Sequence, residues 1–358
     1  MTRTAIRSPA EWKSAELGRR DDWLYRLDAA DIAEIDDAYR RFEAARVPLE
    51  KVTREDFPAP RFARIAERAL AALEEGPGMF MIRGFPLDRF RLEDARRIYW
   101  CLGKYLGTAA SQSDEGDVIG DVRDLRLPPD SPRFRAYKTS GAAAFHTDSC
   151  DVAGLFVVRA AKSGGRSLVA SSVAIHNELL RAKPDLLEVL YRPFYWSMQG
   201  QERTGEAPYY PQPIFTVHEG NFSCRYIRGQ IKNGQRFPDV PRFAPEQVAA
   251  LDALDAAAAD PEFHFLTDFQ PGDLQLCNNH VVMHARTGFE DHPEPERRRH
   301  LLRMWLSVPN SRALSPLLAR IYKDRAPGAV RGGFPPKNPG RIVFETSAEW
   351  ENRMNATH

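Results

Sequence analysis

The sequence predicts an α+β fold in which a jelly-roll core of β-strands is flanked by helices. Three observations predict it: amphipathic helical patterns dominate residues 1 to about 105, short strand-like runs separated by Gly and Pro dominate residues 106 to about 310, and no glycine-rich phosphate loop occurs. Many short strands with helical additions favour a jelly roll over alternating β–α–β units. With 358 residues, 43% of them hydrophobic, the chain can bury a large core.

The first elements are helices. In "DAADIAEIDDAYRRFEAAR" apolar residues recur at three- and four-residue steps, which places them on one helix face: Ile32, Ile35, Tyr39 and Phe42. A second helix, "PRFARIAERALAALEEGPG", ends at its Gly-Pro-Gly. The strand "MFMIRGF" follows, and "RLEDARRIYWCLGKYLG" is a third amphipathic helix.

Helices at about 172–190 and 245–259 interrupt the strands that follow. Near the C-terminus, "KDRAPGAVRGGFPPKNPGR" is a predicted loop that either orders over a site or forms ordinary surface. We therefore expect a single domain over 1–358, with a helical portion at about 1–105 packed on a jelly-roll core at about 106–310, and a C-terminal extension at 311–358.

Charge and composition exclude several classes of protein. Lys and Arg number 50 against 49 Asp and Glu, so the net charge of +1 gives no electrostatic reason to expect nucleic acid or an anionic membrane as partner. The four cysteines are far apart and form no CxxC motif, which suits a reduced protein better than a disulfide framework or a thiolate zinc site. Without an apolar run near 18 residues or a hydrophobic signal core, we expect a cytoplasmic protein. A homo-oligomer stays open.

A His-x-acid pattern occurs three times: His146 with Asp148, His176 with Glu178, and His292 with Glu294. The second pair lies in a helical pattern, where residues two apart diverge by about 200°, so it is predicted to be at the surface. The third lies in a charged, proline-containing loop. The first pair precedes "DVAGLFVVRAA", a run typical of a buried strand. Because residues two apart in a strand share a face, the first pair can reach one point.

A metal needs a third ligand, and the best source is "LQLCNNHVVMH", which resembles a buried strand and carries His280 and His284. A lone histidine in a buried strand is more often a hydrogen-bonded core residue than a ligand. Two histidines and one carboxylate would leave three positions open on Fe(II), enough for a bidentate oxidant precursor and O2. Catalytic zinc is the chemical alternative.

Downstream, "ERRRHLLRMWLSVP" contains two arginines that would share one face of a strand over 299–307: Arg299 and Arg303, together with Leu301 and Trp305. Burying such cations is costly unless each meets an anion. Either they pair with Asp or Glu on a sheet surface, or they form a clamp for a small dicarboxylate beside the metal.

The motifs "FHTD", "AKSGGRSLVASS", "NNHVVMHARTGF" and "RRRHLLRMWL" together resemble the TauD/TfdA-like (taurine dioxygenase superfamily) Fe(II)- and 2-oxoglutarate-dependent oxygenases over about residues 80 to 310. The resemblance implies a double-stranded β-helix core within one oxygenase domain. It also implies that His146, Asp148 and His284 are the metal ligands, and that His280 is not one. Because Asp148 is an acid, unlike the small residue of the related halogenases, it argues against a halide ligand.

The same resemblance implies that Arg299 binds the far carboxylate of 2-oxoglutarate, helped by Ser167, where the family often has threonine. It places Arg303 near the other carboxylate of the co-substrate or near an anionic substrate. The stretch "HARTGFEDHPEPERRR" is longer than in short-loop members of the family, so Arg286 or Arg298 is an alternative for the role of Arg299.

The implied activity is that of a dioxygenase (EC 1.14.11.-) using Fe(II), 2-oxoglutarate and O2. It would oxidise an unactivated C–H bond of a small, carboxylate-bearing molecule, such as an amino acid or a natural-product intermediate, with release of succinate and CO2. Candidate substrate residues come from Arg303 and from "APYYPQPIFTVHEGNFSCRYIRGQI": Tyr209, Tyr210, Arg225 and Arg228. The alternative is that this segment is an ordinary strand with packed tyrosines and solvated arginines. The alternatives are a jelly-roll divalent-metal hydrolase or isomerase, and a non-catalytic 2-oxoglutarate-binding protein.

Overall fold

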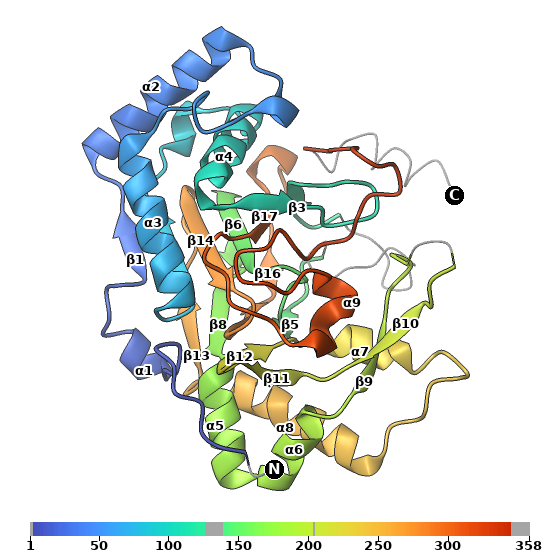
Figure 1. The fold of residues 1–358 in the computed structure, drawn as a ribbon. Coiled ribbons are helices and arrows are strands. Elements are labelled where there is room, and N and C mark those ends of the chain that lie inside the picture. Colours follow the sequence, from blue (N-terminus) through green and yellow to red (C-terminus); the bar gives the residue numbers. More distant parts are fainter. Residues whose placement is uncertain (1–2, 126–138, 203–204, 345–358) are drawn as a thin grey trace.

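Two β-sheets form the core of the computed structural model, which describes residues 3–125, 139–202 and 205–344 (Figure 1). The larger sheet has seven strands: β1 (Leu24–Arg26), β2 (Met79–Arg83), β3 (Thr108–Ala110), β4 (Gly120–Val122), β6 (Val152–Arg159), β14 (Asp273–Asn278) and β17 (His300–Ser307). Their order is β1-β2-β14-β6-β17-β3, and β4 also pairs with β17.

The smaller sheet has four strands in the order β13-β8-β15-β5: β5 (Ala143–His146), β8 (Ser167–Ser171), β13 (His264–Thr267) and β15 (Val282–Arg286). Side chains of the two sheets meet, as Ser167 Oγ and Gln275 Oε1 do at 2.8 Å. Three two-stranded sheets are the remaining ones in the described part of the chain: β7 (Ser163–Gly164) with β16 (Phe289–Glu290), β9 (Phe194–Ser197) with β10 (Tyr209–Gln212), and β11 (Phe215–His218) with β12 (Asn221–Cys224).

The larger sheet has one apolar face and one face that carries polar side chains, because successive residues of a strand point to opposite faces. On one face, alternate residues of β14 and β17 join the core formed with the N-terminal helices: Leu274, Leu276, Leu302, Met304 and Leu306. On the other face, Gln275, Leu155 and Arg303 lie in one row across β14, β6 and β17. The second face therefore carries polar side chains into the space between the sheets.

Three helices predicted in the N-terminal portion are confirmed: α2 (Ala29–Ala45), α3 (Pro60–Glu74) and α4 (Leu92–Leu106). The first starts at Asp28, whose carboxylate accepts hydrogen bonds from the N–H groups of Ala30 and Asp31. Helices α3 and α4 contact the larger sheet (Figure 1). The same portion supplies β1 and β2 to that sheet, and β2 is the predicted strand "MFMIRGF".

The helix predicted at 172–190 is two helices, α5 (Ser172–Ala182) and α6 (Pro184–Leu190). Pro184 lacks an N–H and disfavours helical geometry at Lys183, which has φ −146° and ψ 58°. The prediction at 245–259 is confirmed as α8 (Pro245–Ala259). Helices α5 and α8 contact the smaller sheet. Helix α6 contacts α5 and α8. Three short helices complete the described fold: α1 (Ser14–Leu17), α7 (Arg228–Gly234) and α9 (Ala319–Tyr322).

The prediction that His176 lies at the surface is wrong. Its side chain is fully buried in α5, and its Nε2 lies 2.8 Å from the hydroxyl of Tyr191. The rings of Phe215 and Phe222 pack against it. The acidic residue two positions on, Glu178, suggested an exposed pair. In the fold, α6 and β11 cover the face of α5 that carries His176.

"LQLCNNHVVMH" is not one strand but the end of β14, a turn, and the start of β15 in the other sheet. Asn278 causes the break: its Oδ1 accepts from the N–H of His280, and its Nδ2 donates to Leu73 O at 2.9 Å. A side chain that bonds its own backbone two residues on favours a turn over continued strand. The crossing places His284, and not His280, in the smaller sheet.

The extension after β17 returns over the core as an irregular segment. Arg331 is buried and its Nε donates to Asp151 Oδ1 at 2.8 Å. The N–H of Gly333 donates to Ser149 O at 2.6 Å, and the ring of Phe334 lies 6.1 Å from that of Trp305. The predicted loop is therefore ordered against the residues that follow Asp148, while residues 345–358 of the predicted extension lie outside the described residues. Among the described helices, none is both long enough and apolar enough to span a bilayer.

Candidate active site

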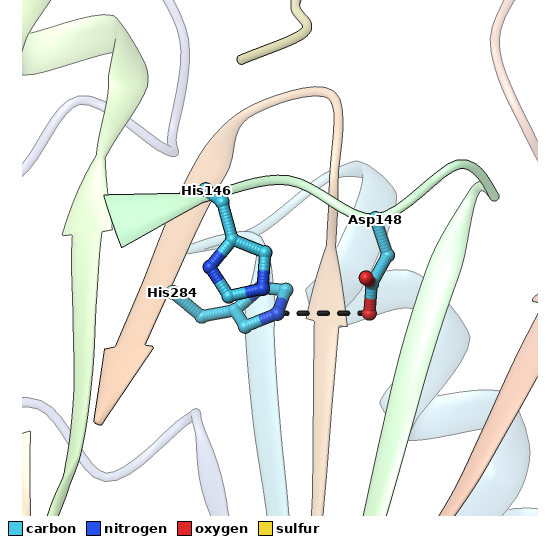
Figure 2. A group of neighbouring side chains, drawn as sticks. All are labelled: His146, Asp148 and His284. Atoms are coloured by element: carbon cyan, nitrogen blue, oxygen red, sulfur yellow. Dashed lines mark ion pairs between the residues drawn. The ribbon is translucent and has the colours of Figure 1, made fainter. Parts of the chain in front are cut away.

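One donor atom from each of His146, Asp148 and His284 lies within 4.8 Å of the others (Figure 2). The two histidines are cross-strand partners on β5 and β15, and their ring centroids are 4.4 Å apart. The carboxylate of Asp148 approaches from the side, with its Oδ2 3.6 Å from His284 Nε2. The three side chains predicted to bind metal thus converge on one point.

Asp148 reaches this point for a reason other than the predicted one. Strand β5 ends at His146, and Asp148 lies in the connection to β6 rather than two residues along a strand. Three hydrogen bonds hold the connection: Thr147 N–H to Tyr226 O (2.8 Å), Tyr226 N–H to Thr147 Oγ1 (3.0 Å), and Asp148 N–H to Asn279 Oδ1 (2.8 Å). Asn279, which the sequence analysis did not single out, therefore positions the carboxylate.

The protonation states suit a divalent metal. His146 Nδ1 lies 2.8 Å from Ala144 O, which leaves Nε2 for a ligand. Burial and the neighbouring His146 lower the pKa of His284 to about 3, so this imidazole is neutral. Burial alone would raise the pKa of Asp148, but Arg303, whose Nη1 lies 3.6 Å from its Oδ1, brings it below the usual value. Asp148 Oδ2 is buried without a hydrogen-bond partner in the described structure. Two imidazoles, of which that of His284 is neutral, and one carboxylate fit Fe(II).

His280 lies outside this group of three. Its Nε2 is 2.8 Å from Asp151 Oδ1, the oxygen that also accepts from Arg331. The side chains of all three residues are almost completely buried. His280 therefore joins the C-terminal extension to the core, a structural role that agrees with the expectation that it is not a ligand.

The buried imidazole of His280 predicts acid sensitivity of folding. Burial lowers its pKa to about 4, whereas histidine in an unfolded chain titrates near about 6.5. Between these values only the unfolded chain takes up the proton, so stability is full above the upper value and is lost as the pH falls. From about pH 7 to about pH 5, we expect the free energy of unfolding of the metal-free protein to fall by about 1–2 kcal/mol more than in His280→Gln. Urea unfolding at both pH values measures it, and equal losses would contradict the prediction.

Arg299 is a buried cation beside Gly165 and Phe289. It directly precedes β17 and is 3% exposed, with its guanidinium 5.1 Å from the ring centroid of Phe289. Gly165, at φ +66°, gives it room, because a Cβ there would lie 3.1 Å from Arg299 Nε. Burial and the neighbouring Arg286 lower the pKa of Arg299 to about 9. Its Nη1 has no hydrogen-bond partner within the described residues, which is the condition expected of a group that awaits an anion.

Polar side chains lie near the metal-ligand candidate His284 on the neighbouring strands. Ser167 on β8 lies opposite Arg286 on β15, and Arg286 shares a strand face with His284 two residues earlier. Ser167 Oγ donates to Gln275 Oε1, while Gln275 Nε2 and Thr267 Oγ1 are buried without partners among the residues described. Gln275 was missed in the sequence, although the two-residue period of β14 would have placed it between the sheets.

The other arginines differ in their partners. Arg303 donates from Nε to Gln112 Oε1 at 2.7 Å and forms the ion pair with Asp148, so it braces a metal-ligand candidate inside the core instead of pairing at a sheet surface. Arg286 donates to the carbonyls of Thr139 and Gly141. Arg298 donates to the carbonyls of His292 and Pro293 in its own loop.

The candidate substrate residues separate into two groups. Tyr210 and Arg225 are buried, and Arg225 Nη2 donates to Ser149 Oγ at 3.1 Å, one residue beyond Asp148. Arg228 instead forms ion pairs with Asp252 and Asp255 of α8. The ring of Tyr209 packs against Tyr195 and Phe237. The structure thus brings only the first two, and Arg303, to the neighbourhood of Asp148.

Known proteins match this chain in sequence and in fold. The family model described as taurine catabolism dioxygenase TauD, TfdA family, matches residues 23–305. The chain is 33% identical over 312 residues to FR-33289 synthase of Streptomyces rubellomurinus (strain ATCC 31215), covering 84% of this chain and 90% of that protein. It is 26% identical over 302 residues to taurine hydroxylase-like protein SAT17 of Stachybotrys chartarum (strain CBS 109288 / IBT 7711), covering 82% of this chain and 77% of that protein.

Two solved structures illustrate the likeness in fold. Asparagine oxygenase in complex with Fe(II), 2S,3S-3-hydroxyasparagine and succinate has a TM-score of 0.62 and 17% identity, covering 79% of this chain and 93% of its own. The non-haem iron oxygenase OrfP in complex with Fe and alpha-ketoglutaric acid has a TM-score of 0.58 and 16% identity, covering 79% and 93%. These matches confirm the predicted jelly-roll fold with flanking helices.

Proposed function

This chain belongs to the TauD/TfdA family and is an Fe(II)- and 2-oxoglutarate-dependent oxygenase, and we propose that it oxidises an unactivated C–H bond of a small, carboxylate-bearing molecule. The observation that carries the proposal is the meeting of three metal-ligand candidates within 4.8 Å, in a fold that also buries Arg299 with no hydrogen-bond partner for its Nη1 among the described residues. A hydrolytic zinc site would give no use to a buried, incompletely paired Arg299.

In this proposal His146, Asp148 and His284 hold Fe(II) by Nε2, a carboxylate oxygen and one imidazole nitrogen. Bound iron, with 2-oxoglutarate and O2, supplies the oxidising chemistry that yields succinate and CO2. The chain contributes fixed ligand orientation: Asn279 Oδ1 accepts a hydrogen bond from the N–H of Asp148, and Arg303 forms an ion pair with the Asp148 carboxylate. Burial of Asp148 and His284 keeps water away from the reacting groups.

Arg299 and Ser167 then hold 2-oxoglutarate, the first by charge and the second by a neutral hydrogen bond. The Arg299 guanidinium is buried, and an anion would supply the hydrogen-bond partner that its Nη1 lacks among the described residues. Ser167 would turn its hydroxyl from Gln275 to the same carboxylate. Because the guanidinium lies beside Gly165 and Phe289, its orientation is already set before the anion binds.

Replacing Ser167 with Ala should weaken 2-oxoglutarate binding by about 0.5–1.5 kcal/mol, the value of one neutral hydrogen bond. Anaerobic titration of 2-oxoglutarate into the Fe(II) protein measures the change through the visible charge-transfer band of the keto-carboxylate chelate. Ser163→Ala is the matched control, since Ser163 is exposed in β7. An equal effect of both changes would contradict the role given to Ser167.

The names of the two solved structures support a substrate of amino-acid size. Asparagine oxygenase binds a hydroxyasparagine, and OrfP was solved with Fe, succinate and (3S)-hydroxy-L-Arg. Both ligands carry a carboxylate, which suits a site rich in buried arginine. Their identities to this chain are 17% and 15%, so the class of molecule, and not the individual amino acid, is what we carry over.

The test is iron-dependent release of succinate across a library of amino acids and other small carboxylates. We expect at least one compound to raise succinate release above the substrate-free rate with Fe(II), and none to do so with Zn(II). Hydrolysis supported by Zn(II) would favour the hydrolase alternative. Tight 2-oxoglutarate binding without succinate from any compound would favour the non-catalytic binding protein.

A further inference from the structure

A second buried arginine lies beside the three metal-ligand candidates. Arg225 directly follows β12 and is 1% exposed. Its Nη2 donates to Ser149 Oγ (3.1 Å), Tyr210 Oη (3.4 Å) and Gln230 Oε1 (3.4 Å). Its Nε and Nη1 are buried without a hydrogen-bond partner in the described part of the chain. Nor does any described carboxylate come within 4.0 Å of this guanidinium.

A buried guanidinium without a counterion is unfavourable, so its charge must be compensated in some state of the protein. Burial alone would lower the pKa of Arg225, but Tyr210, Tyr322 and the more distant carboxylate of Asp148 raise it above its usual value. The side chain is therefore a cation. Asp148 is a poor permanent counterion, because it already pairs with Arg303 and belongs to the proposed metal site.

The surroundings of Arg225 supply further donors and a flat wall. Tyr210 and Gln212 lie on the buried face of β10, and the amide oxygen and nitrogen of Gln212 both lack partners among described residues. Trp196 is the cross-strand partner of Tyr210, and the Arg225 guanidinium lies 5.0 Å from its ring centroid. The Nε and Nη1 groups of Arg225, with the hydroxyls of Tyr210 and Ser149 beside them, are thus donors that an oxyanion could use.

The backbone fixes this group of donors next to the iron ligands. Thr147 and Tyr226 exchange two hydrogen bonds, which join the segment of Asp148 to the segment of Arg225. The bond from Arg225 to Ser149 joins the same two segments on the other side of Asp148. A molecule bound at Arg225 would therefore lie near Ser149 and Asp148, whereas Arg299 lies beside Gly165 and Phe289.

We propose that Arg225, Tyr210 and Ser149 bind an oxyanion head group of the prime substrate and so determine which substrates the enzyme accepts. This inference rests on the proposed oxygenase function. A carboxylate, a sulfonate or a phosphonate would each satisfy the donors, since all present oxygens with a negative charge. Arg228, three residues on, takes no part, because Asp252 and Asp255 already neutralise it.

The test measures binding of acetate, sulfate and inorganic phosphate to the anaerobic Fe(II) protein saturated with 2-oxoglutarate, at constant ionic strength set with chloride. The thermal unfolding midpoint against anion concentration gives each affinity. We expect saturable binding of at least one anion, weakened about 30-fold or more in Arg225→Gln, as for loss of a buried charge-assisted contact. Arg228→Gln is the matched control and should bind like the parent. The anion that binds most tightly identifies the head group.

Unchanged anion binding in Arg225→Gln would overturn the inference, as would loss in Arg303→Gln alone. If Arg225→Gln does not fold, Tyr210→Phe decides, with an expected weakening of about 3- to 10-fold for one hydroxyl. Failure of the proposed function is distinguishable: a parent protein that never forms the 2-oxoglutarate charge-transfer band refutes the oxygenase assignment of the site. A parent that forms the band but binds no anion through Arg225 refutes this inference alone.

Discussion

Asp148→Ala, His146→Ala and His284→Ala should each abolish Fe(II) binding at micromolar metal. Each change removes one of the three protein donors that, among the described residues, lie within 4.8 Å of one another. Asp148→Ala also removes one carboxylate from the ion pair with Arg303, so the site loses negative charge beside a buried cation. Anaerobic equilibrium dialysis followed by metal analysis measures the loss without depending on turnover.

His280→Gln is the matched control for this prediction. Glutamine keeps a hydrogen-bond donor for Asp151, and His280 belongs to that contact and not to the group of three. We expect the variant to retain iron. Equal loss of iron in all four variants would show that the assignment of ligands is wrong. Asp148→Gly is a finer test, since it should retain at most weak iron and lose oxidising activity.

The sequence predicted the three ligand candidates but not the way in which they meet. Strand propensity placed His146 correctly, because the apolar run after it is β6 and the residues before it are β5. Asp148 lies outside both strands, and its position depends on Asn279 and Tyr226, which are distant in sequence. Local pattern contains no information on such contacts, so the three residues were grouped through the resemblance of the motif.

The same limit explains the substrate residues. Arg225 and Arg228 look equivalent in the sequence, each beside an aromatic or apolar residue at the end of a strand-like run. Their difference arises from α8, which brings Asp252 and Asp255 to Arg228 and no carboxylate to Arg225. The partner of a charged side chain is a tertiary property, and only the fold separates a neutralised arginine from a buried, uncompensated one.

Arg299→Gln should weaken 2-oxoglutarate binding by about 2–4 kcal/mol, the range for loss of a buried charge-assisted pair. Glutamine keeps polarity and much of the length but removes the charge that the far carboxylate requires. The stability of the protein without 2-oxoglutarate should change less, because the guanidinium has an unsatisfied Nη1 and a pKa lowered by burial in that state. Anaerobic titration with the visible charge-transfer band gives the affinity, and thermal unfolding gives the stability.

Arg298→Gln and Arg286→Gln complete this prediction as matched changes on either side of the long loop. Arg298 donates to two carbonyls of that loop, so its replacement should leave 2-oxoglutarate affinity unchanged. Arg286 lies opposite Ser167 and contacts the same ring of Phe289, but it already donates to Thr139 and Gly141 carbonyls. Its replacement should weaken binding less than that of Arg299. A larger effect in Arg286→Gln would show that Arg286 on β15, two residues from His284, binds the far carboxylate in place of Arg299. No effect in any of the three variants would show that 2-oxoglutarate binds elsewhere.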